Sequence, residues 1–229
     1  MKQFEQALVT ADHDAPDIGE IPGFEFHPIC AADGWTKDPS ALRRLSDPAI
    51  IQGMLREREA GTIIGGAKTS KTWIALAIAI AVSDGKPFLG RDTVKTRVLY
   101  LDYELKPGTL QGRVSKLSTQ PPTGLQYQCF RGRSRGELPS PEDLERFIKK
   151  EGFGLVVIDS LYKTGWVKEE NSNDSTPQDL AALQRLVDET GASLLVIDHT
   201  SKGGGADKSV VDAARGASAK GGFMTCYSF

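Results

Sequence analysis

A stretch of small, basic and hydroxyl residues carries the clearest chemical pattern in the sequence: Gly65-Gly66-Ala67-Lys68-Thr69-Ser70-Lys71-Thr72. It approximates G-x-x-x-x-G-K-S/T, a loop between a strand and a helix that wraps phosphates with its backbone N–H groups. The N-terminus of the following helix would also point at the anion. Lys71 is expected at the β and γ phosphates, and Thr72 on Mg²⁺. The alternative is a glycine-rich turn beside an unrelated pair of lysines.

Ser70 stands where this pattern has its second glycine. If that position requires a positive φ, a serine there costs roughly 1 kcal/mol or more. Such strain would weaken nucleotide affinity without abolishing it. Lys68 adds a second cation to the loop.

Carboxylates close the apolar runs 155–159 and 97–104. Asp159 is predicted to support the water shell of Mg²⁺ opposite Thr72, with a turn or a helix cap as the alternative. Glu104 is preferred over Asp102 as the group that orients and deprotonates an attacking water. The alternative is a pair of solvated acids at the end of a strand.

A further apolar run, 194–198, leads into His199. A lone histidine usually has a structural role. Ligands of parallel sheets, however, gather at the carboxyl ends of the strands. His199 is therefore a candidate sensor of the γ-phosphate, and a structural loop histidine is the alternative.

The elements that would position these residues alternate along the chain. Strands are predicted at 62–65, 97–102, 125–130, 155–159 and 193–198, and helices at 73–82, 110–117, 141–150 and 177–190. The runs at 155–159 and 194–198 are apolar throughout, as in central strands covered on both faces. The fold class predicted is therefore α/β, a mainly parallel central sheet flanked by helices.

The chain is predicted to comprise a loosely ordered arm over 1–45 and one compact domain over 46–229. Asp47 and Pro48 resemble the start of a helix that continues through the apolar residues up to Leu55. With a net charge of −2 among 229 residues, contact with nucleic acid would require a local basic patch. We expect a cytoplasmic protein that does not bind membranes, because neither a secretory leader nor a long apolar run is found.

In combination and order, these motifs resemble those of the RecA-like P-loop ATPases, specifically the RepA type of hexameric plasmid replicative helicase. The resemblance covers roughly Pro48 to Phe229. It rests on the loop Gly65 to Thr72, Leu101-Asp102-Tyr103-Glu104, Val157-Ile158-Asp159, Glu169 to Asp174, Asp198-His199-Thr200-Ser201-Lys202 and Ala214-Arg215-Gly216-Ala217-Ser218-Ala219.

The resemblance implies a sheet in which the Glu104 strand lies beside the Asp159 strand. The strand that ends at Asp198 would separate the Asp159 strand from that of the phosphate loop. It also implies ATP and Mg²⁺ at a subunit boundary of a homo-oligomer, a hexamer in the full-length form. Glu104 would be the catalytic glutamate and His199 the sensor.

Arg215 would be an arginine finger for the neighbouring subunit, and a loop arginine paired with Asp212 is the alternative. The stretch 221–229 lies where the family begins its next strand, which indicates a truncated form.

The resemblance also predicts single-stranded DNA as a partner. The loops at 163–177 and 201–213 resemble the channel loops of the family and carry lysines, but acidic residues reduce their field. Plain flexible loops are the alternative. The rival function is a nucleotide-binding regulatory or scaffold ATPase that controls assembly without unwinding DNA.

Overall fold

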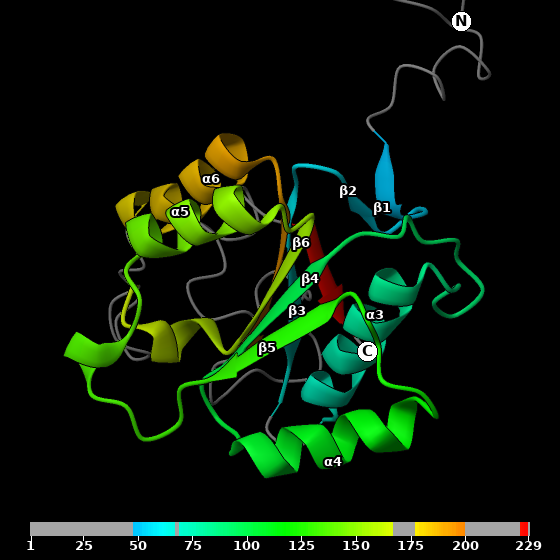
Figure 1. Cartoon of the computed structure of the whole chain (residues 1–229). Helices are drawn as coiled ribbons and strands as arrows, with labels where there is room; N and C mark the ends of the chain where they lie inside the picture. The colour runs from blue at the N-terminus through cyan, green and yellow to red at the C-terminus, as the bar shows by residue number, and fades with distance from the viewer. Residues whose placement is uncertain (1–47, 67–68, 167–176, 200–224, 229) are drawn as a thin grey trace, which may run out of the picture. The chain divides into compact units, whose positions relative to one another are not determined.

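The computed structural model describes residues 48–66, 69–166, 177–199 and 225–228. A six-stranded sheet with the strand order β5-β4-β6-β7-β3-β8 dominates it (Figure 1). Every pair of neighbouring strands in this sheet is parallel. The strands are β3 (Ala60–Gly65), β4 (Val98–Asp102), β5 (Leu125–Cys129), β6 (Leu155–Asp159), β7 (Ser193–His199) and β8 (Thr225–Ser228). The predicted α/β fold is confirmed, and β8 forms within 221–229.

Helices cover the sheet on both faces (Figure 1). Helices α3 (Lys71–Asp84) and α4 (Pro107–Leu117) lie on one side, and α5 (Pro141–Glu151) and α6 (Pro177–Thr190) on the other. Successive strand residues point to opposite faces, so Tyr100 joins the core with α3 whereas Leu101 joins the core with α5 and α6. Burial on both faces explains why the central strands are apolar at nearly every position.

The strands run in the same direction, so their polar carboxyl ends meet at one edge of the sheet. Strand β4 lies beside β6, and β7 separates β6 from β3, as the family resemblance implied. In the register, Asp102 lies opposite Asp159, and Gly65 lies opposite His199. The chain continues from this edge into α3 and into two short 3₁₀ helices, η2 (Arg135–Glu137) and η3 (Leu161–Thr164). The edge is therefore where a ligand would meet these side chains.

The helix predicted after Asp47 and Pro48 is wrong. A hairpin occupies this segment, with β1 (Ala49–Ile51) antiparallel to β2 (Leu55–Arg56). The turn between the strands contains Gly53 at a φ of 66°, which glycine adopts without strain. The hairpin buries Ile50, Ile51 and Leu55 in the core beside α3, and the β-branched isoleucines favour a strand.

Some of the predictions fall on residues outside the described ranges. They are the arm over 1–45, Ala67 and Lys68 of the phosphate loop, Arg215, and most of both candidate DNA loops. Within the described ranges, no helix has the length and apolar character needed to cross a membrane.

Candidate functional site

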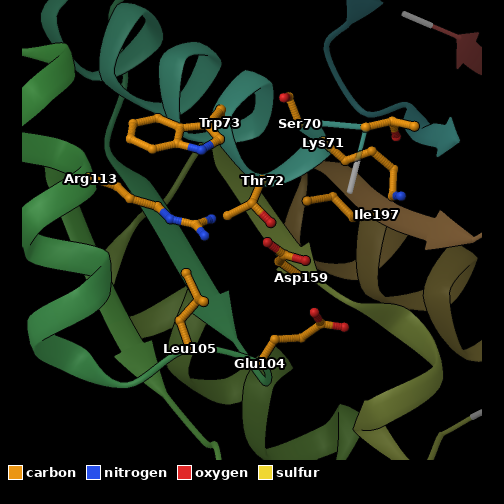
Figure 2. A pocket seen from close by; sticks show the side chains of 10 residues that line it. Ser70, Lys71, Thr72, Trp73, Glu104, Leu105, Arg113, Asp159 and Ile197 are labelled. Carbon is orange, nitrogen blue, oxygen red and sulfur yellow. The ribbon is translucent and has the colours of Figure 1, made fainter. Parts of the chain in front are cut away.

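A pocket of about 370 Å³ lies where α3 begins and where β4, β6 and β7 end (Figure 2). This volume is within the range of small-molecule sites in proteins. Charged, hydroxyl and apolar side chains all line it: Thr69, Ser70, Lys71, Thr72, Trp73, Glu104, Leu105, Arg113, Asp159 and Ile197. The structure thus brings together Lys71, Thr72, Glu104 and Asp159, which the sequence analysis selected separately.

The loop before α3 is closed by its own hydrogen bonds. Thr69 Oγ1 donates to the carbonyl of Gly66 at 2.8 Å. Lys71 Nζ donates to the carbonyls of Gly65 and Gly66 at 2.8 and 2.6 Å. A Cβ atom on Gly65 would lie only 2.8 Å from Thr69 Oγ1, so this tight turn favours glycine. An ammonium group has three donors, so its bonds to the loop leave Lys71 able to meet an anion.

Ser70 has the backbone conformation in which a serine is strained. It is the N-cap of α3, with φ 66° and ψ 15°, in the left-handed region. Its side chain makes no capping hydrogen bond. The position therefore has the positive φ on which the predicted strain depends. The loop carries a strain of roughly 1 kcal/mol that glycine would not.

Ser70→Gly is expected to tighten binding of Mg-ATP up to about fivefold, because strain at serine lowers the fraction of free protein whose loop holds the binding conformation, and glycine restores it. Calorimetric titration with a non-hydrolysable ATP analogue measures this directly. Ser70→Ala is the matched control, since alanine keeps the strain and loses only the hydroxyl. Equal gains for glycine and alanine would show that the hydroxyl, and not the backbone, limits affinity.

Lys71 is surrounded by acidic groups. Its side chain is buried, and burial lowers the pKa of the ammonium group. The carboxylates of Asp159, Glu104 and Asp198 oppose this shift. The cation therefore balances negative charge contributed by three different strand ends.

Asp159 is the most deeply buried acid of the pocket, with only 2% of its surface exposed. Its carboxylate accepts hydrogen bonds from the hydroxyls of Tyr100, at 3.0 Å, and Thr72. Burial, helped by the nearby Asp102 and Glu104, raises the pKa of Asp159 to about 6. The Thr72 hydroxyl lies beside the Asp159 carboxylate, in a region with excess negative charge. This arrangement fits Mg²⁺, which prefers oxygen ligands and often binds through one carboxylate and substrate phosphates.

Asp159→Asn is expected to stabilise the fold more at pH 8 than at pH 4. The pKa of Asp159 rises from 3.8 to about 6 on folding, so ionised Asp159 destabilises the folded state. This penalty is absent below pH 3.8 and grows as the pH rises from 3.8 to about 6. Above that pH it levels off at up to about 3 kcal/mol. Asparagine is neutral throughout, so its advantage should follow the same course. Urea unfolding at pH 4, 6 and 8 checks this, and an advantage independent of pH would contradict it.

Glu104 and Asp102 occupy different environments, although they are two residues apart. Asp102 is fully buried, and its Oδ1 accepts from the backbone N–H groups of Glu104 and Leu105 at 2.7 and 2.6 Å. These bonds shape the turn after β4. Glu104 lines the pocket, and Figure 2 shows its carboxylate below that of Asp159.

One oxygen of Glu104 is contacted by three groups that follow β6. Oε1 accepts from Ser160 Oγ at 3.0 Å and from the Tyr162 hydroxyl at 3.3 Å. Lys163 Nζ lies 3.2 Å from the same oxygen. Lys163 lies in η3 and not at the start of a loop, as the sequence had indicated. These groups occupy one of the two carboxylate oxygens that could hold a water.

Arg113 and Trp73 line the pocket but were not selected from the sequence. Arg113 extends from α4 toward Thr72 (Figure 2), and its guanidinium lies 5.2 Å from the centre of the Trp73 ring. It brings a second described cation to the walls of the pocket. Arg113 is far along the chain from the phosphate loop, and no motif surrounds it. Nothing in the sequence alone therefore indicated that it lines the pocket.

His199 reaches the same edge through its strand. Its backbone pairs with Gly65, the first residue of the phosphate loop. The position of its side chain lies outside what the structure describes.

The fold and the phosphate loop together define a P-loop NTPase with a RecA-like fold. A family model described as an AAA domain matches residues 28–205, more than half of the chain, and the chain belongs to this family. The family includes helicase-like proteins, and membership suggests ATPase activity and implies nucleotide binding, usually with Mg²⁺. No curated protein matches the sequence.

Proposed function

We propose that the protein hydrolyses ATP at this pocket with Mg²⁺, and that hydrolysis drives work on DNA by a RepA-type ring subunit. The observation that carries the ATPase part is the convergence of four groups on one pocket. Lys71 and Thr72 come from α3, Asp159 from the end of β6 and Glu104 from the turn after β4. A cation, a metal-binding hydroxyl and two acids are the groups that phosphoryl transfer requires.

Each of these residues has a separate role in the proposed reaction. Lys71 binds the β and γ phosphates, and the backbone of the loop from Gly65 surrounds them. Thr72 and Asp159 hold the Mg²⁺ side of the pocket. Glu104 orients the attacking water and accepts its proton. When bound with ATP, Mg²⁺ supplies positive charge that offsets the charge on the phosphate oxygens.

The DNA-dependent and oligomeric parts rest on the family resemblance. His199 would sense the γ-phosphate from the end of β7. Arg215 would act as an arginine finger on the neighbouring subunit of a homo-oligomer, which in the full-length form would be a hexamer. Single-stranded DNA would run along the loops that begin after η3 and β7.

Measuring ATP hydrolysis with and without a single-stranded oligonucleotide, alongside sizing with and without ATP, tests this proposal. A motor should hydrolyse ATP severalfold faster with the oligonucleotide and should assemble with ATP. Assembly with ATP but no response to the oligonucleotide would favour the regulatory or scaffold ATPase. One observation favours that rival: the ion pair between Lys163 and Glu104 engages the proposed base.

A further inference from the structure

A second pocket, of about 500 Å³, lies beside the turn that carries Glu104, at the ends of β4 and β5. Glu104 belongs to the walls of both pockets. Aromatic and basic residues also line this second pocket: Tyr103, Phe130, Arg131, Arg133 and Lys163. This second pocket is large enough for a small ligand or for one unit of a polymer.

Basic side chains line this second pocket, and the ion pairs that they make with carboxylates are exposed or partly exposed. Arg133 pairs with Glu137 at 3.3 Å, but more than half of each side chain is exposed, so the pair is weak. Within the described part of the chain, Arg131 pairs with no carboxylate. Lys163 pairs with Glu104. An anion that enters the pocket would meet three cations and displace only exposed or partly exposed pairs.

The aromatic wall of the second pocket contains a buried hydroxyl. The rings of Tyr103 and Phe130 stack with centroids 4.8 Å apart. Tyr103 is 5% exposed, and its hydroxyl has no hydrogen-bond partner among the described residues. This hydroxyl is closed off from the pocket, so a ligand would meet the rings of the wall, chiefly the half-buried Phe130, and not the hydroxyl.

The segments that carry the basic residues are tied to each other. Arg135 Nη2 donates to the carbonyl of Gly165 at 2.9 Å. Trp166 Nε1 donates to the carbonyl of Pro139 at 2.9 Å. These bonds join the chain after β5, which carries Arg131 and Arg133, to the chain after β6, which carries Lys163. A ligand held by the arginines therefore lies within the same small unit as the ion pair on Glu104.

We propose that this second pocket binds a phosphate group, and that the bound phosphate takes Lys163 away from Glu104, which removes the competing cation from the carboxylate that orients the attacking water. The proposal rests on the proposed function, because it assumes that Glu104 is the base. The phosphate could belong to single-stranded nucleic acid or to free phosphate. The first source is favoured, because basic side chains beside an aromatic ring are typical of sites that bind a nucleic-acid backbone and stack its bases.

The test compares Lys163→Ala with the matched control Lys163→Arg in the full chain, with and without an oligothymidylate. Alanine removes the ion pair, so hydrolysis without the oligonucleotide should rise about threefold, and the oligonucleotide should stimulate it no further. Arginine keeps the charge, so both the low basal rate and the stimulation should remain. A basal rate in Lys163→Ala equal to or below that of the wild type would overturn the switch.

Binding is measured separately from activity by the anisotropy of a fluorescent oligothymidylate with a non-hydrolysable ATP analogue. Replacing Arg131 and Arg133 with alanine should weaken binding about tenfold. Unchanged binding would overturn the site. Displacement of the oligonucleotide, and equal stimulation, by millimolar inorganic phosphate would support the pocket and identify free phosphate as the source.

The two proposals can fail separately in this design. Lack of hydrolysis in the wild type under every condition would overturn the ATPase assignment and with it the switch. Weaker oligonucleotide binding by the double arginine variant would then still support the phosphate site.

Discussion

Glu104→Gln should bind Mg-ATP almost as tightly as the wild type and hydrolyse it at least about a hundredfold more slowly. Glutamine has the size of glutamate and can still accept hydrogen bonds from Ser160 and Tyr162. It cannot take a proton from water, and loss of a general base typically costs this much. Single-turnover hydrolysis, with binding measured by a fluorescent ATP analogue, separates the two effects.

Asp102→Asn is the matched control for this prediction. The Asp102 carboxylate accepts from the N–H groups of Glu104 and Leu105, and an asparagine oxygen can do the same. Its effect on the chemical step should therefore be small. If Asp102→Asn slows hydrolysis a hundredfold while Glu104→Gln does not, the choice between these acids is wrong.

Lys71→Ala should lower kcat/KM for ATP about a thousandfold. The ammonium group is the described cation on the phosphate loop itself, and it lies where the β and γ phosphates would bind. Removing it weakens ground-state binding and also removes charge stabilisation during phosphoryl transfer. Steady-state hydrolysis over a range of ATP concentrations measures the loss.

Lys86→Ala controls for the loss of a lysine near the opposite end of α3. Lys86 is exposed and pairs with Asp84, far from the pocket, so kcat/KM should stay within about twofold of the wild type. Circular dichroism should show that both variants are folded. A folded Lys71→Ala protein with normal kcat/KM would refute the phosphate-loop assignment.

The strands and helices were predictable where burial imposes a simple pattern. Strand β6 and helix α6 have the predicted bounds, because a strand covered on both faces must be apolar and a helix beginning at proline has a clear start. The segment 49–56 was misread because it is too short for periodicity to separate a helix from a hairpin. Gly53, which forms the turn, was the signal that should have decided it.

The site was predictable only where chemistry coincides with a motif. Lys71, Thr72, Asp159 and Glu104 were selected because they follow strands or form the phosphate loop, and all four line the pocket. Arg113 and Trp73 meet because α4 packs near α3, and the second pocket forms between the turn after β4, the chain after β5 and η3. Such contacts depend on which face of each element points inward, and one sequence does not show this at the required precision.

The position of β3 has a consequence for synthesis of the chain. The strand that leads into the phosphate loop pairs with residues 194–199 on one side and 225–228 on the other. A ribosome makes β3 long before either neighbour, and such distant pairings form slowly. During translation the nascent loop therefore lacks the sheet that supports it. Nucleotide binding should begin only after β7 has left the ribosomal exit tunnel, so a bound nucleotide would stabilise the finished domain but would not guide its early folding.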